Sequence, residues 1–290
     1  MEAARINQEA DAQELRAQLH GMWGAVAGGW AAHAAFADER GAVVTGTMLG
    51  ATRVQPGERV LELACGPGGV GIAASKLAGP TGVVVISDVA PAMTAIARSR
   101  AEALRLENVE VRELDLEQID EPDASFDVVL CREGLMLVQE PALALREIAR
   151  VLRPGGRVSL AVWGPREQNP WLALVFDAVT AELGVPMPPP GNPGPFSLAD
   201  AATVARLLAK AGLAEGTVRE IATPYHAASA EEWWSRTVDL AGPLAKRLAM
   251  LPEPAAQALR ARAYASVGPY ETADGLEIPG LSLVASATAR

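Results

Sequence analysis

The stretch RVLELACGPGGVGIAASKL, residues 59–77, decides the fold of this chain. A short apolar run leads into a glycine-rich turn and then into helical spacing, which predicts a strand–turn–helix unit. Glycines in such a turn let a ligand approach the backbone closely, and the free N–H groups of the next helix favour an anion. That anion is a pyrophosphate or a carboxylate, and the glycines alone do not distinguish the two.

Two motifs overlap in this turn. Gly66, Gly68 and Gly71 fit the G-x-G-x-x-G pattern of dinucleotide-binding proteins, which is a weak signal by itself. Glu62 precedes the glycines, at the end of the predicted strand. A carboxylate there would repel a pyrophosphate but suits a ligand with an ammonium and a sulfonium group. We therefore favour a nucleoside ligand with positive charge over one with linked phosphates.

Two further acids follow the next two predicted strands. Asp88 lies twenty residues after Gly68, a spacing that places a carboxylate on ribose hydroxyls. It serves either kind of nucleoside ligand, so it does not choose between them. Asp115 comes after the third strand, where it can accept a hydrogen bond from an adenine amino group beside the Leu116 amide.

Short β-branched runs alternate with helical patterns between residues 59 and 164. This alternation predicts parallel βαβ units with helices on both faces of one sheet. Strands are expected at residues 60–63, 83–87, 109–112, 128–131 and 158–163, and helices at residues 69–77, 91–106 and 142–152.

Outside this region the pattern is looser. Helical spacing at residues 12–24 and 41–53 predicts an N-terminal helical lid over residues 1–54, ahead of a ligand-binding core over residues 55–165. Residues 166–290 are expected to hold substrate-cap helices plus the last sheet strands, within the same domain as the core. Helices are expected at 171–183, 230–250 and 254–265, with a capping box at 197–200, and strands at 217–223 and 276–290. The proline-rich stretch 186–196 is read as a rigid loop.

Composition narrows the function classes. The chain has 290 residues and a formal net charge of −10, and an acidic surface repels phosphate backbones, so no nucleic-acid partner is expected. Cys65 and Cys131 are too few for a disulfide framework, and no His/Cys/Asp cluster shows metal-ligand spacing, so no metal is expected. The N-terminus lacks an apolar leader and no run is long enough to span a bilayer, so we expect a cytoplasmic protein.

Together these motifs resemble one family. The stretches VLELACGPGG (60–69), VVVISDVAPAM (83–93), VEVRELDLEQID (109–120), SFDVVLCREGL (125–135) and ALREIARVLRPGGRVSLAVWG (144–164) are similar to class I S-adenosylmethionine-dependent methyltransferases. More narrowly, they resemble the small-molecule methyltransferases of the ubiquinone/menaquinone-biosynthesis type. The resemblance covers about residues 55–165. It implies an α/β fold: a Rossmann-like, doubly wound, mostly parallel seven-stranded sheet with a helical N-terminal lid and C-terminal cap insertions.

The same resemblance implies a binding site for S-adenosylmethionine, with S-adenosylhomocysteine as product. Gly66 and Gly68 would line the methionine part, Asp88 the ribose, and Asp115 and Leu116 the adenine edge. The other cofactor-site residues expected are Trp30, Glu62, Ala64, Cys65, Val89, Met93, Cys131 and Arg132. Ala64 replaces the first glycine of the family's acid-x-Gly-x-Gly-x-Gly pattern. Alanine is small enough to change little if its φ is negative, whereas a positive φ would strain the turn and count against this mapping.

Proton acceptors and substrate contacts are less clearly marked. His33 and His226 are the candidate catalytic residues, and Glu133 is a further candidate base because it follows the fourth strand near the site. His20 is expected to be a surface or packing residue. Substrate contacts are expected from Tyr225, Trp233 and Trp234.

Three functions remain open. The favoured one is methyl transfer to the oxygen, carbon or nitrogen of a small, largely apolar acceptor, a reaction suited to secondary metabolism. The second is an NAD(P)-dependent oxidoreductase, which fits the glycines and Asp88 but leaves Glu62 and Asp115 unexplained. The third is a protein that binds S-adenosylmethionine without catalysis. A homodimer is the assembly we expect.

Overall fold

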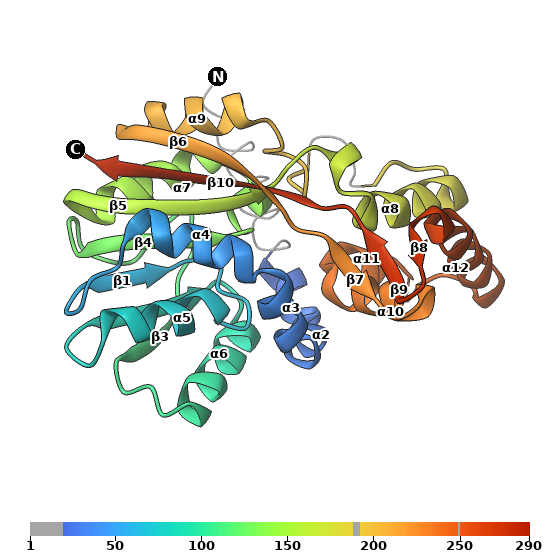
Figure 1. The fold of residues 1–290 in the computed structure, drawn as a ribbon, viewed down its shortest axis with the longest axis horizontal. Coiled ribbons are helices and arrows are strands. Elements are labelled where there is room, and N and C mark those ends of the chain that lie inside the picture. Colours follow the sequence, from blue (N-terminus) through green and yellow to red (C-terminus); the bar gives the residue numbers. More distant parts are fainter. Residues whose placement is uncertain (1–19, 188–191, 249) are drawn as a thin grey trace, which may run out of the picture.

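A computed structural model describes residues 20–187, 192–248 and 250–290 (Figure 1). Its centre is a seven-stranded sheet in the order β3-β2-β1-β4-β5-β10-β6. These strands are β1 (Arg59–Glu62), β2 (Val83–Asp88), β3 (Val109–Glu113), β4 (Phe126–Arg132), β5 (Leu152–Trp163), β6 (Leu213–Ala222) and β10 (Leu281–Ala289). The predicted strands of the core are thereby confirmed to within two residues at each end, except that β5 begins at Leu152, six residues before its expected start.

Pairing in the sheet is parallel from β3 to β5, and β10 runs antiparallel to both of its neighbours, β5 and β6. The strand order reverses between β1 and β4, since the chain moves outward to β3 and then returns to the other side of β1. In open α/β sheets, ligands bind at such a reversal, beyond the carboxyl ends of the strands. The turn at residues 63–68 leaves β1 at this place.

Helices cover both faces of the sheet. Apolar side chains of α4 (Ala42–Thr52) and α5 (Gly69–Ala78) pack on one face with α6 (Pro91–Ala103), and those of α7 (Pro141–Val151) and α9 (Ala201–Lys210) pack on the other. The inner strands are buried on both sides and read as continuous apolar runs in the sequence for that reason. The expected doubly wound, Rossmann-like architecture is confirmed.

A second apolar cluster lies beyond the carboxyl ends of the strands. It contains α8 (Pro170–Leu183), α10 (Ala230–Leu240), α11 (Gly242–Leu248) and α12 (Glu253–Val267), drawn to the right of the sheet in Figure 1. A three-stranded sheet, which the sequence patterns had not indicated, joins them. It consists of β7 (Tyr225–Ala227), β8 (Glu271–Thr272) and β9 (Gly275–Ile278), in the order β7-β9-β8.

The helices α2 (Ala27–Ala32) and α3 (Ala34–Arg40) lie between the sheet and this second cluster (Figure 1). Helix α2 contacts both α6 and α10. Residues 20–25 are helical as expected, whereas residues 12–19 of the predicted first helix lie outside the described residues. Residues 188–191 of the proline-rich stretch lie outside them as well.

Several local predictions were wrong in detail. Asp200 rather than Ser197 caps α9, because its carboxylate accepts from the amides of Ala202 and Thr203, whereas Ser197 donates to the Met136 carbonyl. The helix expected over 230–250 is split at Ala241 into α10 and α11, and the expected last strand is split into β9 and β10. Three short 3-10 helices complete the described elements: Leu135–Leu137, Arg166–Gln168 and Gly268–Tyr270.

Candidate active site

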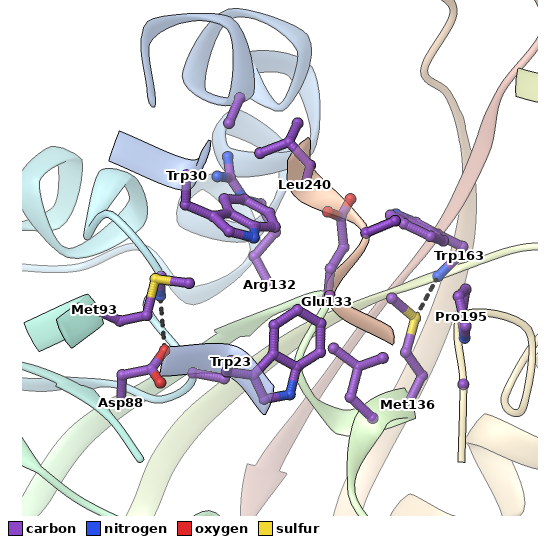
Figure 2. Close-up of a pocket in the computed structure, with 18 of the residues that line it drawn as sticks. Trp23, Trp30, Asp88, Met93, Arg132, Glu133, Met136, Trp163, Pro195 and Leu240 are labelled. Carbon is purple, nitrogen blue, oxygen red and sulfur yellow. Dashed lines mark hydrogen bonds between the residues drawn. The ribbon is translucent and has the colours of Figure 1, made fainter. Parts of the chain in front are cut away.

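A cavity of about 400 Å³ opens at the carboxyl ends of β1, β2 and β4, between the sheet and the second apolar cluster. Figure 2 shows its two ends. Asp88 and Met93 lie at one end, Trp163 and Pro195 lie at the other, and Glu133 lies between them. Of the expected site residues, those lining it are Trp30, Glu62, Ala64, Cys65, Gly66, Asp88, Val89, Met93, Asp115, Leu116, Arg132 and Tyr225.

The turn after β1 is held in a left-handed conformation at three places. Gly66 and Gly68 have φ values of 51° and 83°, which glycine adopts without cost. Ala64 has a φ of 51°, so the condition for an unstrained turn is not met. A Cβ at this φ costs about 1–2 kcal/mol, and the turn therefore carries backbone strain beside the cavity.

Glu62 is buried at the start of α5, with 2% of its surface exposed. Its carboxylate accepts a hydrogen bond of 2.8 Å from the amide of Gly71. A side chain on Gly71 would collide with this carboxylate and with Ile86, so the third glycine of the motif serves close packing. Burial raises the pKa of Glu62 to about 8, against the opposing effects of the Gly71 hydrogen bond and the positive charge of Arg132.

A second acid lies at the same helix end. Asp38 reaches from α3 to Gly69, the first residue of α5, and forms an ion pair with Arg100. Arg100 also donates to the Pro67 carbonyl at 2.7 Å. Two carboxylates thus lie at the N-terminus of α5, the place where dinucleotide-binding proteins hold a pyrophosphate.

Asp88 lies at the end of β2 with its carboxylate fixed by the backbone. One oxygen accepts from the Gly66 amide at 2.9 Å and the other from the Ala90 amide at 3.0 Å. Burial raises the pKa of Asp88, and these hydrogen bonds oppose that rise. Met93, in the first turn of α6, lines the wall beside it (Figure 2).

Asp115 and Leu116 follow β3 and line the same end of the cavity. Asp115 accepts from the Glu117 amide at 2.8 Å and lies 3.5 Å from the ring nitrogen Nε2 of His20. His20 lines the cavity too, so this residue, expected to be surface or packing, belongs to the site. Trp30 covers the Gly66 turn, and its indole N–H is buried without a hydrogen-bond partner among the described residues.

The end of β4 contributes two charged residues. Arg132 donates to the Thr45 hydroxyl at 2.9 Å, and Glu133 projects between the two ends of the cavity (Figure 2). Glu133 has a φ of 61°, and its amide is held by a 2.7 Å hydrogen bond to the Ala161 carbonyl. Cys131 is fully buried and does not line the cavity, and burial raises the pKa of its thiol to about 12.

Aromatic rings form the end of the cavity farthest from Asp88. Trp163 and Trp171 meet edge to face at 4.8 Å, and Trp171 stacks on Tyr225 at 5.4 Å. Phe36 contacts the other side of Tyr225 at 5.1 Å. Met136 lies beside Trp163, and the backbone amide of Trp163 donates to the Met136 sulfur at 3.3 Å (Figure 2). This end suits a flat apolar molecule.

The two candidate histidines, His33 and His226, both lie away from the cavity. His33 lies at the junction of α2 and α3 and pairs with Asp239 of α10 at 2.9 Å. His226 is exposed on β7. Neither of them lines the cavity.

Two tryptophans expected to touch substrate pack elsewhere. Trp233 is fully buried and donates to the Trp171 carbonyl at 2.8 Å, and Trp234 meets the ring of Tyr264. Gly68 also lies outside the lining, where it caps α5. Within residues 20–187, 192–248 and 250–290, no group of three or more His, Cys, Asp or Glu residues is arranged to hold a metal ion.

Comparison with known proteins shows which families this chain is similar to. Residues 60–156 match the family model described as a methyltransferase domain. The ubiquinone/menaquinone biosynthesis C-methyltransferase UbiE of Ectopseudomonas mendocina is 39% identical over 125 residues, which are 43% of this chain and 48% of that protein. UbiE of Pseudomonas savastanoi pv. phaseolicola is 38% identical over 126 residues, 43% and 49% of the two chains. The chain spans about half the length of these curated relatives.

The match to the methyltransferase-domain model is confined to residues 60–156. Solved structures agree on the fold. YcgJ from Bacillus subtilis has a TM-score of 0.58 at 20% identity, covering 85% of this chain and 97% of its own. A putative methyltransferase from Bacillus halodurans has a TM-score of 0.56 at 19% identity, covering 84% and 98%.

The fold itself admits more than one reaction. The [4+2]-cyclase SpnF has a TM-score of 0.52 at 21% identity, covering 84% of this chain and 80% of its own. Among the described residues, none of the helices is long and apolar enough to cross a membrane.

The structure also adds cavity residues that sequence patterns did not reveal. They line the end of the cavity farthest from Asp88, away from the glycine turn: Arg40, Phe36, Met136, Trp163 and Trp171. Arg40 ends α3 and has the sequence signature of an ordinary helix C-terminus, where a basic residue complements the helix dipole. No local signal marks it as buried.

Proposed function

We propose that this protein transfers the methyl group of S-adenosylmethionine to a small, largely apolar acceptor. The proposal is carried by one observation: a methyltransferase domain in which a buried acid, Glu62, lies at the N-terminus of α5 and lines the cavity. A carboxyl group at this place ionises to suit an ammonium, and it fills the position that a phosphate would need. The acidic chain, with a formal net charge of −10, also supports a small acceptor over nucleic acid.

The residues at the Asp88 end fit this cofactor. Glu62 would hold the amino group, the Asp88 carboxylate the ribose hydroxyls, and Asp115 with the Leu116 amide the adenine edge. Trp30 would close over the Gly66 turn, where its unpartnered indole N–H is available to a bound carboxylate. The cationic sulfur supplies an already activated methyl group, so the chain has to position an acceptor and exclude water.

We propose Glu133 as the residue that accepts a proton from the acceptor. It lies between the cofactor end and the aromatic end (Figure 2), and it forms no ion pair with a described residue. Its φ of 61° is one that a non-glycine residue adopts at a cost, which is common at functional sites. A positioned carboxylate contributes about 10²–10⁴-fold to rate when the acceptor starts protonated.

Turnover tests the proposal. The purified chain is incubated with S-adenosylmethionine and a panel of phenols, quinones and natural products, and S-adenosylhomocysteine formation is followed. We expect acceptor-dependent product with at least one aromatic member of the panel. Tight binding of S-adenosylhomocysteine with no turnover on any member would instead support a protein that binds the cofactor without methylating.

A further inference from the structure

Arg40 is the residue in the aromatic end whose charge the described structure leaves without a partner. Its guanidinium carbon lies 4.1 Å from the Trp171 ring centroid and 5.4 Å from that of Tyr225. Its Nε atom is buried without a hydrogen-bond partner, and the side chain makes no ion pair with any residue in the described ranges. A half-buried cation that rests only against ring faces is poorly compensated.

The nearby charges do not remove this deficit. Burial lowers the pKa of Arg40, and Arg132 lowers it further, whereas the Glu133 carboxylate and Tyr225 favour the charged form. Glu133 attracts the guanidinium without pairing with it. Since a guanidinium stays protonated in proteins, Arg40 presents positive charge to the cavity.

Other polar groups at this end have no hydrogen-bond partner among the described residues, and each of them can donate. The Trp163 indole N–H is buried without a hydrogen bond. The hydroxyl of Tyr225 lies near Thr237 and Arg236 but meets neither at hydrogen-bonding geometry, and the Thr237 hydroxyl is buried and unpaired as well. Buried donors around a cation inside an apolar wall are complementary to an oxyanion.

We propose that the acceptor is a flat conjugated molecule carrying an oxyanion, and that Arg40 binds this oxyanion while the ring lies against Trp163 and Trp171. The inference rests on the proposed function and adds the acceptor's chemical class. The oxyanion is a carboxylate or an ionised phenol or enol. Arg40 is then a specificity-determining residue at the aromatic end, separate from Glu133 and from the cofactor end.

Binding of paired probes in the absence of cofactor tests the inference. Naphthoate is compared with its neutral isostere naphthamide, and nitrophenolate with nitroanisole, by titration calorimetry. We expect at least one anion to bind about tenfold or more tightly than its neutral partner, which is the size of a charge-assisted hydrogen bond. The first pair reports a carboxylate and the second an ionised phenol.

Variants separate a specific contact from general electrostatics. Arg40→Gln is expected to abolish the preference for the anion, Arg40→Lys to keep part of it, and Arg206→Gln, which removes an exposed charge from α9, to keep all of it. A wild-type protein without preference for either anion, or an Arg40→Gln variant that retains the preference while folded by circular dichroism, overturns the inference. Binding of S-adenosylhomocysteine is measured in a separate titration. If the protein did not bind it, that result would count against the proposed function and not against the anion preference.

Discussion

The carboxylate of Glu62 and the backbone amide of Gly71 are joined by a hydrogen bond of 2.8 Å in the first turn of α5. This turn is where the G-x-G-x-x-G motif would place a pyrophosphate, because helix N-termini favour anions. Here an acidic side chain of the protein occupies the anion position. The relationship explains why the same glycines serve a ligand with positive charge.

Binding of S-adenosylhomocysteine is expected to release a proton from Glu62. The pKa of Glu62 is about 8 in the free protein, so the group is largely protonated at neutral pH, and an ammonium ligand favours its ionised form. Affinity should therefore rise as the pH approaches 8, by up to about tenfold per pH unit. Calorimetry in buffers of different ionisation enthalpy measures the proton release, which Glu62→Gln should abolish. Equal proton release by both proteins would remove Glu62 from this role.

The stability of the ligand-free protein should change with pH in the opposite direction. The Glu62 pKa is raised from 4.5 to about 8 on folding, so the folded state binds more protons than the unfolded state within that window. Wild-type stability then falls as pH rises from 4.5 to about 8, and Glu62→Gln lacks this component. Thermal unfolding of both proteins across the window tests the difference. Parallel curves would contradict burial of an ionisable Glu62.

Asp88→Ala is expected to weaken S-adenosylhomocysteine binding by about 1–3 kcal/mol, since charge-assisted hydrogen bonds to the ribose would be lost. The substitution also frees the amides of Gly66 and Ala90, so it should lower the unfolding temperature. Asp200→Ala is the matched control, because it removes the N-cap of α9 away from the cavity. It should lower stability without changing affinity. An unchanged affinity in Asp88→Ala would place the ribose elsewhere.

Ala64 and Gly134 should show coupled effects on stability. A Cβ on Gly134 would lie 2.4 Å from the Ala64 Cβ and 2.9 Å from the Cys131 sulfur. Gly134→Ala should therefore destabilise the protein by about 1–3 kcal/mol, and Ala64→Gly, which also relieves the φ of 51°, should restore part of this loss. Denaturant unfolding of both single variants and the double variant gives the coupling energy. Purely additive effects would show that the two residues are not in contact.

Glu133→Gln is expected to reduce turnover of the best acceptor by about 10²–10⁴-fold while leaving cofactor affinity unchanged. His33→Ala is the comparison, since His33 pairs with Asp239 outside the cavity lining. It should cost about 1 kcal/mol of stability or less and have no such effect on turnover. The reverse ranking of the two variants would make His33 the proton acceptor.

The core was predictable because its signals are local. Strands such as Val83–Asp88 are buried on both faces and appear as continuous apolar runs, and the glycine turn fixes where β1 ends and α5 begins. Asp88 is the last residue of β2, and Asp115 follows the edge strand β3 by two residues. Their positions depend on the strand–turn–helix pattern and on little else.

The aromatic end was not predictable, because it is assembled from distant segments. Arg40 is half-buried, and its guanidinium is covered by Trp171 and Tyr225, which lie far along the chain. His33 pairs with Asp239 of α10, which is also distant in the sequence. Ser197 donates to the Met136 carbonyl instead of capping α9. Local sequence patterns do not reveal such long-range contacts. The histidines were therefore chosen as candidate catalytic residues, and Arg40 was not.

The most direct measurement is ligand binding by calorimetry, with S-adenosylhomocysteine and NADPH or NADH titrated into the same preparation. We predict clear binding of S-adenosylhomocysteine and none of either nicotinamide cofactor, since Glu62 and Asp38 occupy the helix end that a pyrophosphate requires. Binding of a nicotinamide cofactor without binding of S-adenosylhomocysteine would contradict the assignment and the chemistry proposed from it.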